Sequence, residues 1–379
     1  MKICFLDPTF LDYDIHSPLT QGMGGSQSAL CYLAGALAKR GHSITVVNGT
    51  KRPGVYDGVE FIEWQQESVG GVFNRADVLI VQSTAIGQML QGSQIGVRVP
   101  MVLWTGHDAN QPATAHLLRP EERDSWAGFA FVSNWQREVF RKTFALRSER
   151  CTVKYNGISP AFSEAAIEPA WFETGKPPVL AYTSTPFRGL DVLLDAFPLI
   201  RRDWPEAGLR IYSSMSIYGK KGQQSQDPYE VLYAKAASMP GVAYVGPVGQ
   251  TQLAREMAGM AALAYPSIFP ETFCIAAAEA AAVGAALFLT RLGALPEINA
   301  GLASFIDGST DREKLVRDFA ALAARELKIM TGNPGLAAAQ RATRITNYRL
   351  RFAWPRIALE WESWLDSLLG QAITLRAAS

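Results

Sequence analysis

The strongest constraint on the fold is a repeated alternation between short apolar runs and longer stretches of helical character. Apolar runs occupy residues 3–6, 44–47, 59–62, 78–81, 101–104, 130–132 and 152–154, and a second set occupies residues 179–182, 209–212, 243–245, 263–265 and 286–289. Continuous apolar strands separated by helices are typical of parallel sheets covered on both faces. The sequence therefore predicts an α/β protein built from doubly wound parallel sheets.

The chain is long enough for two such domains, because its 379 residues exceed what one hydrophobic core usually serves. The stretch 159–178 contains Pro160, Pro169, Pro177 and Pro178 and little periodicity, which favours a linker. We therefore expect one parallel-sheet domain over residues 1–158 and a second over residues 179–355. After Pro355, apolar residues fall on one stripe of a last helix, 356–379, namely Ile357, Trp361, Trp364, Leu365 and Leu368.

Composition narrows the class of protein. Thirty-six basic and 35 acidic residues leave a net charge of +1, which argues against nucleic acid as a partner. No run of 18 apolar residues occurs and the N-terminus reads as a strand, so a cytoplasmic protein is expected, soluble or peripheral at the inner membrane face. The four cysteines are far apart, without a Cys-x-x-Cys pair, and indicate neither a metal site nor a disulfide framework.

The segment from Pro270 to Glu279 carries the most chemical information. Pro270 disfavours a helical residue before it, and the alanines from Ala276 onward favour a helix, so a helix is expected to begin between Glu271 and Glu279. At about 1.5 Å rise per residue the two carboxylates would lie on the order of 10 Å apart. That is further than the roughly 5–9.5 Å pair of glycoside hydrolases and suits two ends of one extended ligand. The amides at the helix start would face a phosphate between them.

A second candidate site is the Gly-rich loop around Gly24 and Gly25, which precedes a helix and offers amide donors. As a dinucleotide fingerprint it fails, because Gln27 stands where the third glycine belongs and no acidic residue ends the second strand. An oxidoreductase is therefore disfavoured, while an ordinary structural turn stays open. His107 follows the apolar run 101–104, at a strand end where ligands of open α/β sheets bind.

Together these segments resemble the retaining nucleotide-sugar glycosyltransferases of the GT-B class, glycosyltransferase family 4 or "glycosyl transferases group 1", which are marked by Glu, seven residues, Glu. The Pro266-Ser267 strand end before Glu271, the Asn156-Gly157 step and the order of the motifs match along the whole chain. The resemblance implies two facing Rossmann-like domains with an interdomain cleft, the first binding the acceptor and the second the donor. It also implies that the last helix packs back on the first domain; that this helix covers its own domain is the alternative.

The resemblance assigns roles residue by residue. Glu271 would hold hydroxyls of the transferred sugar, Glu279 the ribose, and His107 the sugar and acceptor, while Arg188 would face the diphosphate. The other donor contacts would come from Gly24, Gly25, Ser184, Thr185, Val245, Thr272, Phe273 and Cys274. Asp14, His16 and Trp104 are assigned to the acceptor. No metal or other cofactor is expected besides the UDP- or GDP-linked sugar, and the acceptor would be a saccharide, a lipid-linked or a small molecule.

One departure concerns the phosphate clamp. Family members usually present an arginine and then a lysine after the first strand of the second domain, whereas here Ser184 or Thr185 stands at the arginine position and Arg188 at the lysine position. Hydroxyls donate hydrogen bonds without bringing charge. Lys220 and Lys221 are candidates for the missing cation, or simply solvated lysines.

Three interpretations of function follow. The first is transfer of a sugar to an acceptor hydroxyl with retention, in polysaccharide, glycolipid or other glycoconjugate biosynthesis. The second is a nucleotide-sugar 2-epimerase of the same architecture, and the third is a non-catalytic nucleotide-sugar binder, favoured by the lost arginine. Asp12 and Asp14 have the spacing of a metal-chelating Asp-x-Asp but follow no apolar strand, and an acceptor loop or a solvated loop is favoured. The basic helix after Trp135 would present either a solvated face or a peripheral membrane contact.

Overall fold

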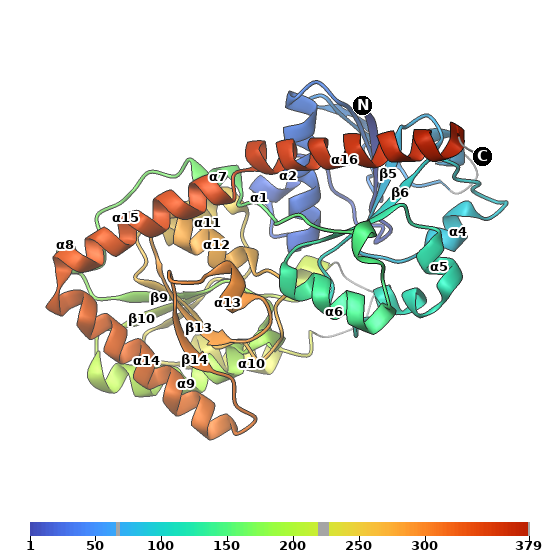
Figure 1. Ribbon diagram of the computed structural model, residues 1–379. Helices are drawn as coiled ribbons and strands as arrows, with labels where there is room; N and C mark the ends of the chain where they lie inside the picture. Colours follow the sequence, from blue (N-terminus) through green and yellow to red (C-terminus); the bar gives the residue numbers. More distant parts are fainter. Residues whose placement is uncertain (66–68, 219–226, 378–379) are drawn as a thin grey trace. The chain divides into compact units, whose positions relative to one another are not determined.

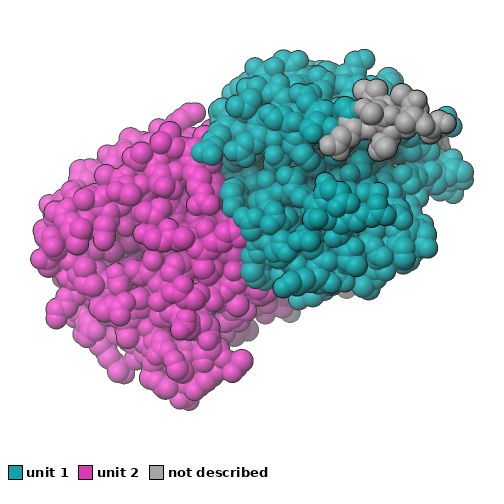
Figure 2. Space-filling view, in the orientation of Figure 1, with its two compact units in different colours: residues 1–18, 25–157, 354–379 teal, residues 19–24, 158–353 magenta. Residues whose placement is uncertain are grey.

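A computed structural model describes residues 1–65, 69–218 and 227–377. The chain divides into two compact units (Figure 2). Unit 1 comprises Met1–Pro18, Gly25–Gly157 and Trp354–Ser379, and unit 2 comprises Leu19–Gly24 and Ile158–Ala353. Each is an α/β body around its own sheet (Figure 1).

The sheet of unit 1 has the strand order β3-β4-β2-β1-β5-β6-β7-β8. All neighbours are parallel except β3 and β4. The strands are β1 (Lys2–Leu6), β2 (Ser43–Asn48), β3 (Gly54–Tyr56), β4 (Val59–Glu63), β5 (Val78–Gln82), β6 (Met101–Thr105), β7 (Gly128–Phe131) and β8 (Cys151–Val153). The α-helices are α2 (Gly25–Lys39), α3 (Val69–Phe73), α4 (Gly87–Gln91), α5 (Pro120–Asp124), α6 (Asn134–Phe144) and α16 (Trp354–Ala377). The boundary between the two units falls within α1 (Ser17–Thr20).

The sheet of unit 2 is wholly parallel, in the order β11-β10-β9-β12-β13-β14. Its strands are β9 (Val179–Tyr182), β10 (Gly208–Ile211), β11 (Val242–Tyr244), β12 (Ala262–Tyr265), β13 (Ala286–Arg291) and β14 (Ser304–Asp307). Its helices are α7 (Pro160–Ser163), α8 (Trp171–Thr174), α9 (Leu190–Asp203), α10 (Glu230–Ser238), α11 (Gln250–Met257), α12 (Ile275–Ala282), α13 (Leu295–Ile298), α14 (Arg312–Gly332) and α15 (Pro334–Arg351).

Both sheets reverse their strand order at one point. In unit 1 the reversal lies between β1 and β5, and in unit 2 between β9 and β12. In open α/β sheets, the loops diverge to opposite faces at such a point, and ligands bind at the carboxyl ends of the strands. The fold thus directs attention to the residues that follow β9 and β12.

The last helix, α16, packs within unit 1. Trp361 is fully buried and its ring lies 5.3 Å from that of Trp104, while Glu362 pairs with Arg40 and His42 at the end of α2. The apolar stripe read from the sequence therefore covers unit 1, because its indole rings fill the space beside β6 and α2.

The structure differs from the sequence-based expectation in three places. Residues 159–178 are not a free linker: they belong to unit 2 and contain α7 and α8. Two strands were missed, β3 and β14. β3 pairs antiparallel with β4 through Asp57 and Gly58, both at positive φ, and this Asp-Gly signal was readable in the sequence. Strand β14 at the sheet edge is only half-buried, so it lacks the continuous apolar pattern of a central strand.

Candidate functional site

The candidate site of unit 2 is formed by the segments that leave β9 and β12. After β9 the chain passes Ser184 and enters a single 3-10 turn, Pro186–Arg188, and after β12 it runs through Pro266 to Glu271. Gly189 lets the two segments approach, because its φ is +113° and a Cβ there would lie 2.2 Å from the carbonyl oxygen of Pro266. The switch point therefore brings Arg188 and Glu271 together although 83 residues separate them.

Glu271 is the centre of this site. Its side chain is 4% exposed, and both carboxylate oxygens accept from Nη1 of Arg188 at 2.5 Å. The hydroxyl of Tyr265 also donates to Oε1 of Glu271, and Ser184 Oγ lies 3.2 Å from the same hydroxyl. Burial, and then the negative charge of Glu271, raise the pKa of Tyr265 well above its ordinary value. The tyrosine thus remains a neutral donor to the carboxylate.

The guanidinium of Arg188 is flanked by two aromatic rings. Its central carbon lies 4.6 Å from the ring centre of Phe269 and 5.4 Å from that of Phe187. Cation–π contacts of this kind favour the charged group and hold its plane in place. In this structure Arg188 pairs with Glu271, and its contact with a phosphate stays a prediction.

The backbone of Glu271 is held by the turn after β13. The amide of Ala294 donates to the carbonyl oxygen of Glu271 at 2.7 Å. Gly293 has a φ of +60°, and a Cβ there would lie 2.4 Å from that same oxygen. The turn therefore needs glycine both for its conformation and for its closeness to Glu271.

Helix α12 begins at Ile275, between the two glutamates, as the sequence predicted. Cys274 precedes it with a φ of +73°, a conformation that is strained for a residue with a side chain. Thr272, Phe273 and Cys274 are buried, and the ring of Phe273 meets Phe352 edge-on at 5.3 Å. Burial raises the pKa of the Cys274 thiol, so it is a neutral packing group. Contact of these three residues with a donor stays a prediction.

Glu279 is buried in the interior of unit 2. It is 4% exposed, and its Oε1 accepts from the backbone amide of Ser159 at 3.0 Å. Burial raises its pKa from 4.5 to about 8, although the bonds from Ser159 and from the side chain of Gln250 act the other way. Ser159 comes from the stretch expected as a linker, and neither it nor Gln250 was identified from the sequence.

The Gly-rich segment lies against the loop after β11. A Cβ on Gly22 would lie 2.7 Å from Cβ of Pro247, and a Cβ on Gly249 would lie 2.5 Å from the carbonyl oxygen of Leu19. Val245, just after β11, is 39% exposed. Gly24 belongs to unit 2, whereas Gly25 opens α2 in unit 1. Close packing therefore requires glycine at positions 22 and 249. Donor contacts of Gly24, Gly25 and Val245 remain predictions.

His107 lies in unit 1 at the carboxyl end of β6, as expected. Its amide donates to Thr105 Oγ1 at 3.0 Å, and its carbonyl accepts from the side chain of Gln136 at 2.7 Å. Gln136 also donates to the carbonyl of Thr105 and thereby fixes the loop. Asp108 next to it is buried.

The residues assigned to the acceptor have structural partners. Asp14 is 5% exposed and pairs with Arg52 at 2.7 Å, and Trp104 packs against Trp361. His16 lies 3.8 Å from Asp57 on the surface. Contact of these three residues with an acceptor stays a prediction. Lys220 and Lys221, considered as substitutes for the missing cation, lie outside the described residues.

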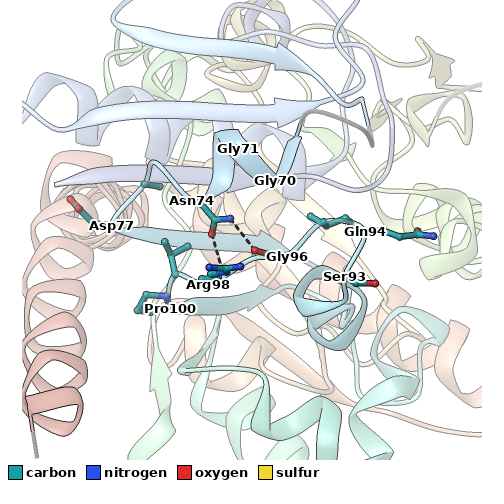
Figure 3. A pocket seen from close by; sticks show the side chains of 12 residues that line it. Gly70, Gly71, Asn74, Asp77, Ser93, Gln94, Gly96, Arg98 and Pro100 are labelled. Atoms are coloured by element: carbon teal, nitrogen blue, oxygen red, sulfur yellow. Dashed lines mark hydrogen bonds between the residues drawn. The ribbon is translucent and has the colours of Figure 1, made fainter. Parts of the chain in front are cut away.

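A hollow in unit 1 lies at the amino ends of the strands of its sheet (Figure 3). Its volume is about 740 Å³, and its lining includes the segments that enter β5 and β6. Asn74 bridges its wall by donating to the carbonyl of Gly96 and accepting from the amide of Arg98. Because it lies at the amino ends of β5 and β6, this hollow is separate from His107, which follows the carboxyl end of β6.

Over the described ranges, no group of three or more His, Cys, Asp or Glu residues is placed to hold a metal ion. Nor does any described helix have the length and apolar character needed to cross a membrane.

A comparison with protein families finds a match within unit 2. Residues 177–328 match the family described as glycosyl transferases group 1, a range that includes Arg188, Glu271 and Glu279. No curated protein matches the sequence.

Solved structures match over nearly the whole chain. Sucrose-phosphate synthase from Thermosynechococcus elongatus has a TM-score of 0.72 at 15% identity, over 98% of this chain and 100% of that one. The UDP-glucose complex of HepE from Anabaena has a TM-score of 0.66 at 17% identity, over 97% and 100%. Starch synthase IV from Arabidopsis thaliana, bound to ADP and acarbose, has a TM-score of 0.70 at 12% identity, over 98% and 99%. The fold is therefore that of the GT-B glycosyltransferases, α/β with two parallel-sheet domains.

Proposed function

We propose that the protein is a retaining glycosyltransferase that moves a sugar from a nucleotide diphosphate sugar to an acceptor hydroxyl. The observation that carries this proposal is the cluster of Glu271, Arg188 and Tyr265 at the switch point of unit 2, directly before α12 and Glu279. The same stretch matches glycosyl transferases group 1. The reported complexes of HepE with UDP-glucose and of starch synthase IV with ADP and acarbose support a nucleotide sugar as donor and a saccharide as one class of acceptor.

In this proposal the charge of the departing diphosphate is the main electrostatic demand. Arg188 would share its guanidinium between Glu271 and the phosphate, since a planar fork can bind two anions. The buried hydroxyl of Thr185 has no hydrogen-bond partner among the described residues and would donate to the same phosphate. Glu271 would orient hydroxyls of the sugar, and Glu279 would bind the ribose.

The proton of the acceptor needs a base near the leaving group. We assign it to the leaving phosphate on the same face of the sugar, with His107 orienting the acceptor. Donation by Arg188 and by the amides around Thr272 would lower the barrier by stabilising the oxygen that receives the electrons of the broken bond.

Incubation with labelled UDP- and GDP-sugars tests the function. Label on an added acceptor, with the anomeric configuration of the donor kept, is the expected result. Release of free sugar alone or an unchanged donor across a broad acceptor panel would count against it. A thermal-shift screen of nucleotide diphosphate sugars selects the donor beforehand, because the right donor raises the unfolding temperature by mass action.

A non-catalytic nucleotide-sugar binder is the second candidate. Ser184 stands where the resembled family has an arginine, and its hydroxyl is engaged with Tyr265 rather than with a cation. This candidate predicts donor binding with unaltered donor. A 2-epimerase would instead return a changed hexosamine, so product analysis in the same assay separates the three functions.

The further proposals concern cofactors and location. Transfer is expected to be metal-independent, with activity unchanged by EDTA. We place the enzyme in the cytoplasm, with peripheral contact to the inner membrane face through the basic residues around α6. There Arg137 and Arg141 pair with Glu138, which reduces the net positive charge of that face. Flotation with anionic vesicles at low and high salt tests this contact.

A further inference from the structure

A small cavity lies in unit 2 at the amino ends of the strands, whereas Glu271 follows the carboxyl end of β12. It is bounded by Trp171 of α8, by Arg341 and Arg344 of α15, and by Gly259 and Gly284, which precede β12 and β13. Its volume is about 10 Å³. Since these segments enter the strands rather than leave them, the cavity is separate from the candidate site.

Two of the residues that line this cavity carry a buried hydrogen-bond donor. Trp171 is 7% exposed and Arg344 is 8% exposed, yet neither Nε1 of Trp171 nor Nε of Arg344 has a hydrogen-bond partner within the part of the chain that the structure describes. An indole and a guanidinium can only donate. Because a buried donor without an acceptor is costly, the cavity calls for a group that accepts from both.

The charge around the cavity favours an anion over water. Arg341 donates to the carbonyl of Glu168 at 2.6 Å and Arg344 to the carbonyl of Gly284 at 3.4 Å, and both acceptors are uncharged. The carboxylate of Glu173 attracts Arg341 from a distance, but its Oε2 already accepts from the amide of Ala170 at 2.7 Å. Burial, and then repulsion from Arg341, oppose the charged form of Arg344 and lower its pKa to about 10. The buried guanidinium of Arg344 and the half-buried one of Arg341 therefore have Glu173 as their one nearby negative charge among the described residues, and its carboxylate is already engaged with the amide of Ala170.

The size of the cavity limits the anion. A volume of about 10 Å³ is roughly that needed for a single water-sized group. A tetrahedral oxyanion with four oxygens is larger than this. We propose that the cavity binds one small anion of chloride size, held by Nε1 of Trp171 and Nε of Arg344.

Such an anion would stabilise unit 2 from the side opposite to the donor. Arg344 reaches the carbonyl of Gly284, just after α12, and Arg349 donates to the carbonyl of Ala282 at the end of that helix. An anion that fixes Arg344 would thus support the carboxyl end of the helix that carries Glu279.

Thermal unfolding of the full chain tests the proposal. Sodium chloride replaces sodium gluconate at constant ionic strength, because gluconate is too large for the cavity. We expect saturating chloride to raise the unfolding temperature by about 3–5 °C. Phosphate at the same ionic strength should give no shift beyond that of gluconate, and a larger shift with phosphate than with chloride would overturn the assignment.

Two matched variants locate the effect. Trp171→Phe removes the indole donor and keeps most of the ring, so the chloride response should disappear. Trp204→Phe removes an indole N–H that already donates to the carbonyl of Ala324 at 3.2 Å, in a ring 5.7 Å from Trp171, so the response should persist. Equal responses in both variants would refute the site. In bromide-soaked crystals an anomalous peak beside Nε1 of Trp171 is expected, and a water there without an anomalous signal would also refute it.

Discussion

At the scale of single residues, Glu271 is surrounded by donors that come from distant parts of the chain. Arg188 follows β9 and Tyr265 ends β12, and both reach the same carboxylate. Breaking a buried pair leaves its partner charge without compensation, which costs more than the pair itself contributes. The carboxylate therefore serves both the stability of the loop and, in the proposed function, the substrate.

We predict that Glu271→Gln lowers the free energy of unfolding by about 3 kcal/mol and lowers kcat by roughly 10²–10³-fold. Denaturant unfolding and the transfer assay measure the two effects. Asp307→Asn is the matched control, since it removes an exposed pair with Arg291 in the same unit and should leave both quantities nearly unchanged. Wild-type kcat in Glu271→Gln would remove this residue from the proposed site.

The raised pKa of Glu279 predicts a pH dependence of stability. Between its ordinary pKa of 4.5 and its folded value of about 8, the unfolded chain loses this proton while the folded chain keeps it. The unfolded state then binds fewer protons, so the contribution of Glu279 to stability falls as pH rises through this window. Below pH 4.5 the group is protonated in both states and this loss is absent.

Glu279→Gln should abolish that component, because an amide does not titrate in this range. Its oxygen can still accept from the amide of Ser159, so this hydrogen bond is kept. The variant should gain stability relative to the wild type between pH 5 and pH 8, as measured by denaturant midpoints. A constant difference across this range would contradict the assignment.

At the scale of elements, the turn between β13 and α13 supports the loop of Glu271. We predict that Gly293→Ala destabilises unit 2 and lowers kcat, because the new Cβ would collide with the backbone of Glu271. Gly301→Ala is the matched control: its φ is +72°, but nothing lies within 4 Å of the added Cβ.

Both variants should therefore lose about 1 kcal/mol to the left-handed conformation, and only Gly293→Ala should lose more. Parallel unfolding curves and transfer rates make the comparison. Equal losses in the two variants would mean that contact with Glu271 contributes nothing.

At the scale of the whole molecule, the chain returns to unit 1 for its last helix. Trp361 is fully buried and packs against Trp104 and Trp364, whereas Leu359 on the same helix is 49% exposed. The stability of unit 1 thus depends on residues that follow unit 2 in the sequence.

We predict that Trp361→Ala costs unit 1 about 3–5 kcal/mol, while Leu359→Ala has little effect. Hydrogen exchange read separately for the peptides of each unit measures the change. The loss should appear in β1, β5 and β6 and leave β9 and β12 protected. Equal loss of protection in both units would show that they unfold together.

Much of the secondary structure could be predicted from short stretches of the sequence. The predicted runs all overlap observed strands, because buried parallel strands carry a continuous apolar pattern that needs no knowledge of their neighbours. The start of α12 after Pro270 followed from backbone preferences. Strand β14 and the two helices of residues 159–178 were not predicted, because a half-buried edge strand and four-residue helices leave only weak periodicity in the sequence.

The sequence by itself determined the α/β class, the approximate positions of the buried strands, and the two glutamates on either side of a helix start, since each depends on local propensity and period. Only the tertiary structure decided that Arg188 pairs with Glu271, that Ser159 meets a Glu279 of raised pKa, and that Trp171 and Arg344 share a cavity. Ion pairing, desolvation and unpaired donors depend on which side chains are buried together. Residues far apart in the chain meet only when the sheets and helices have packed.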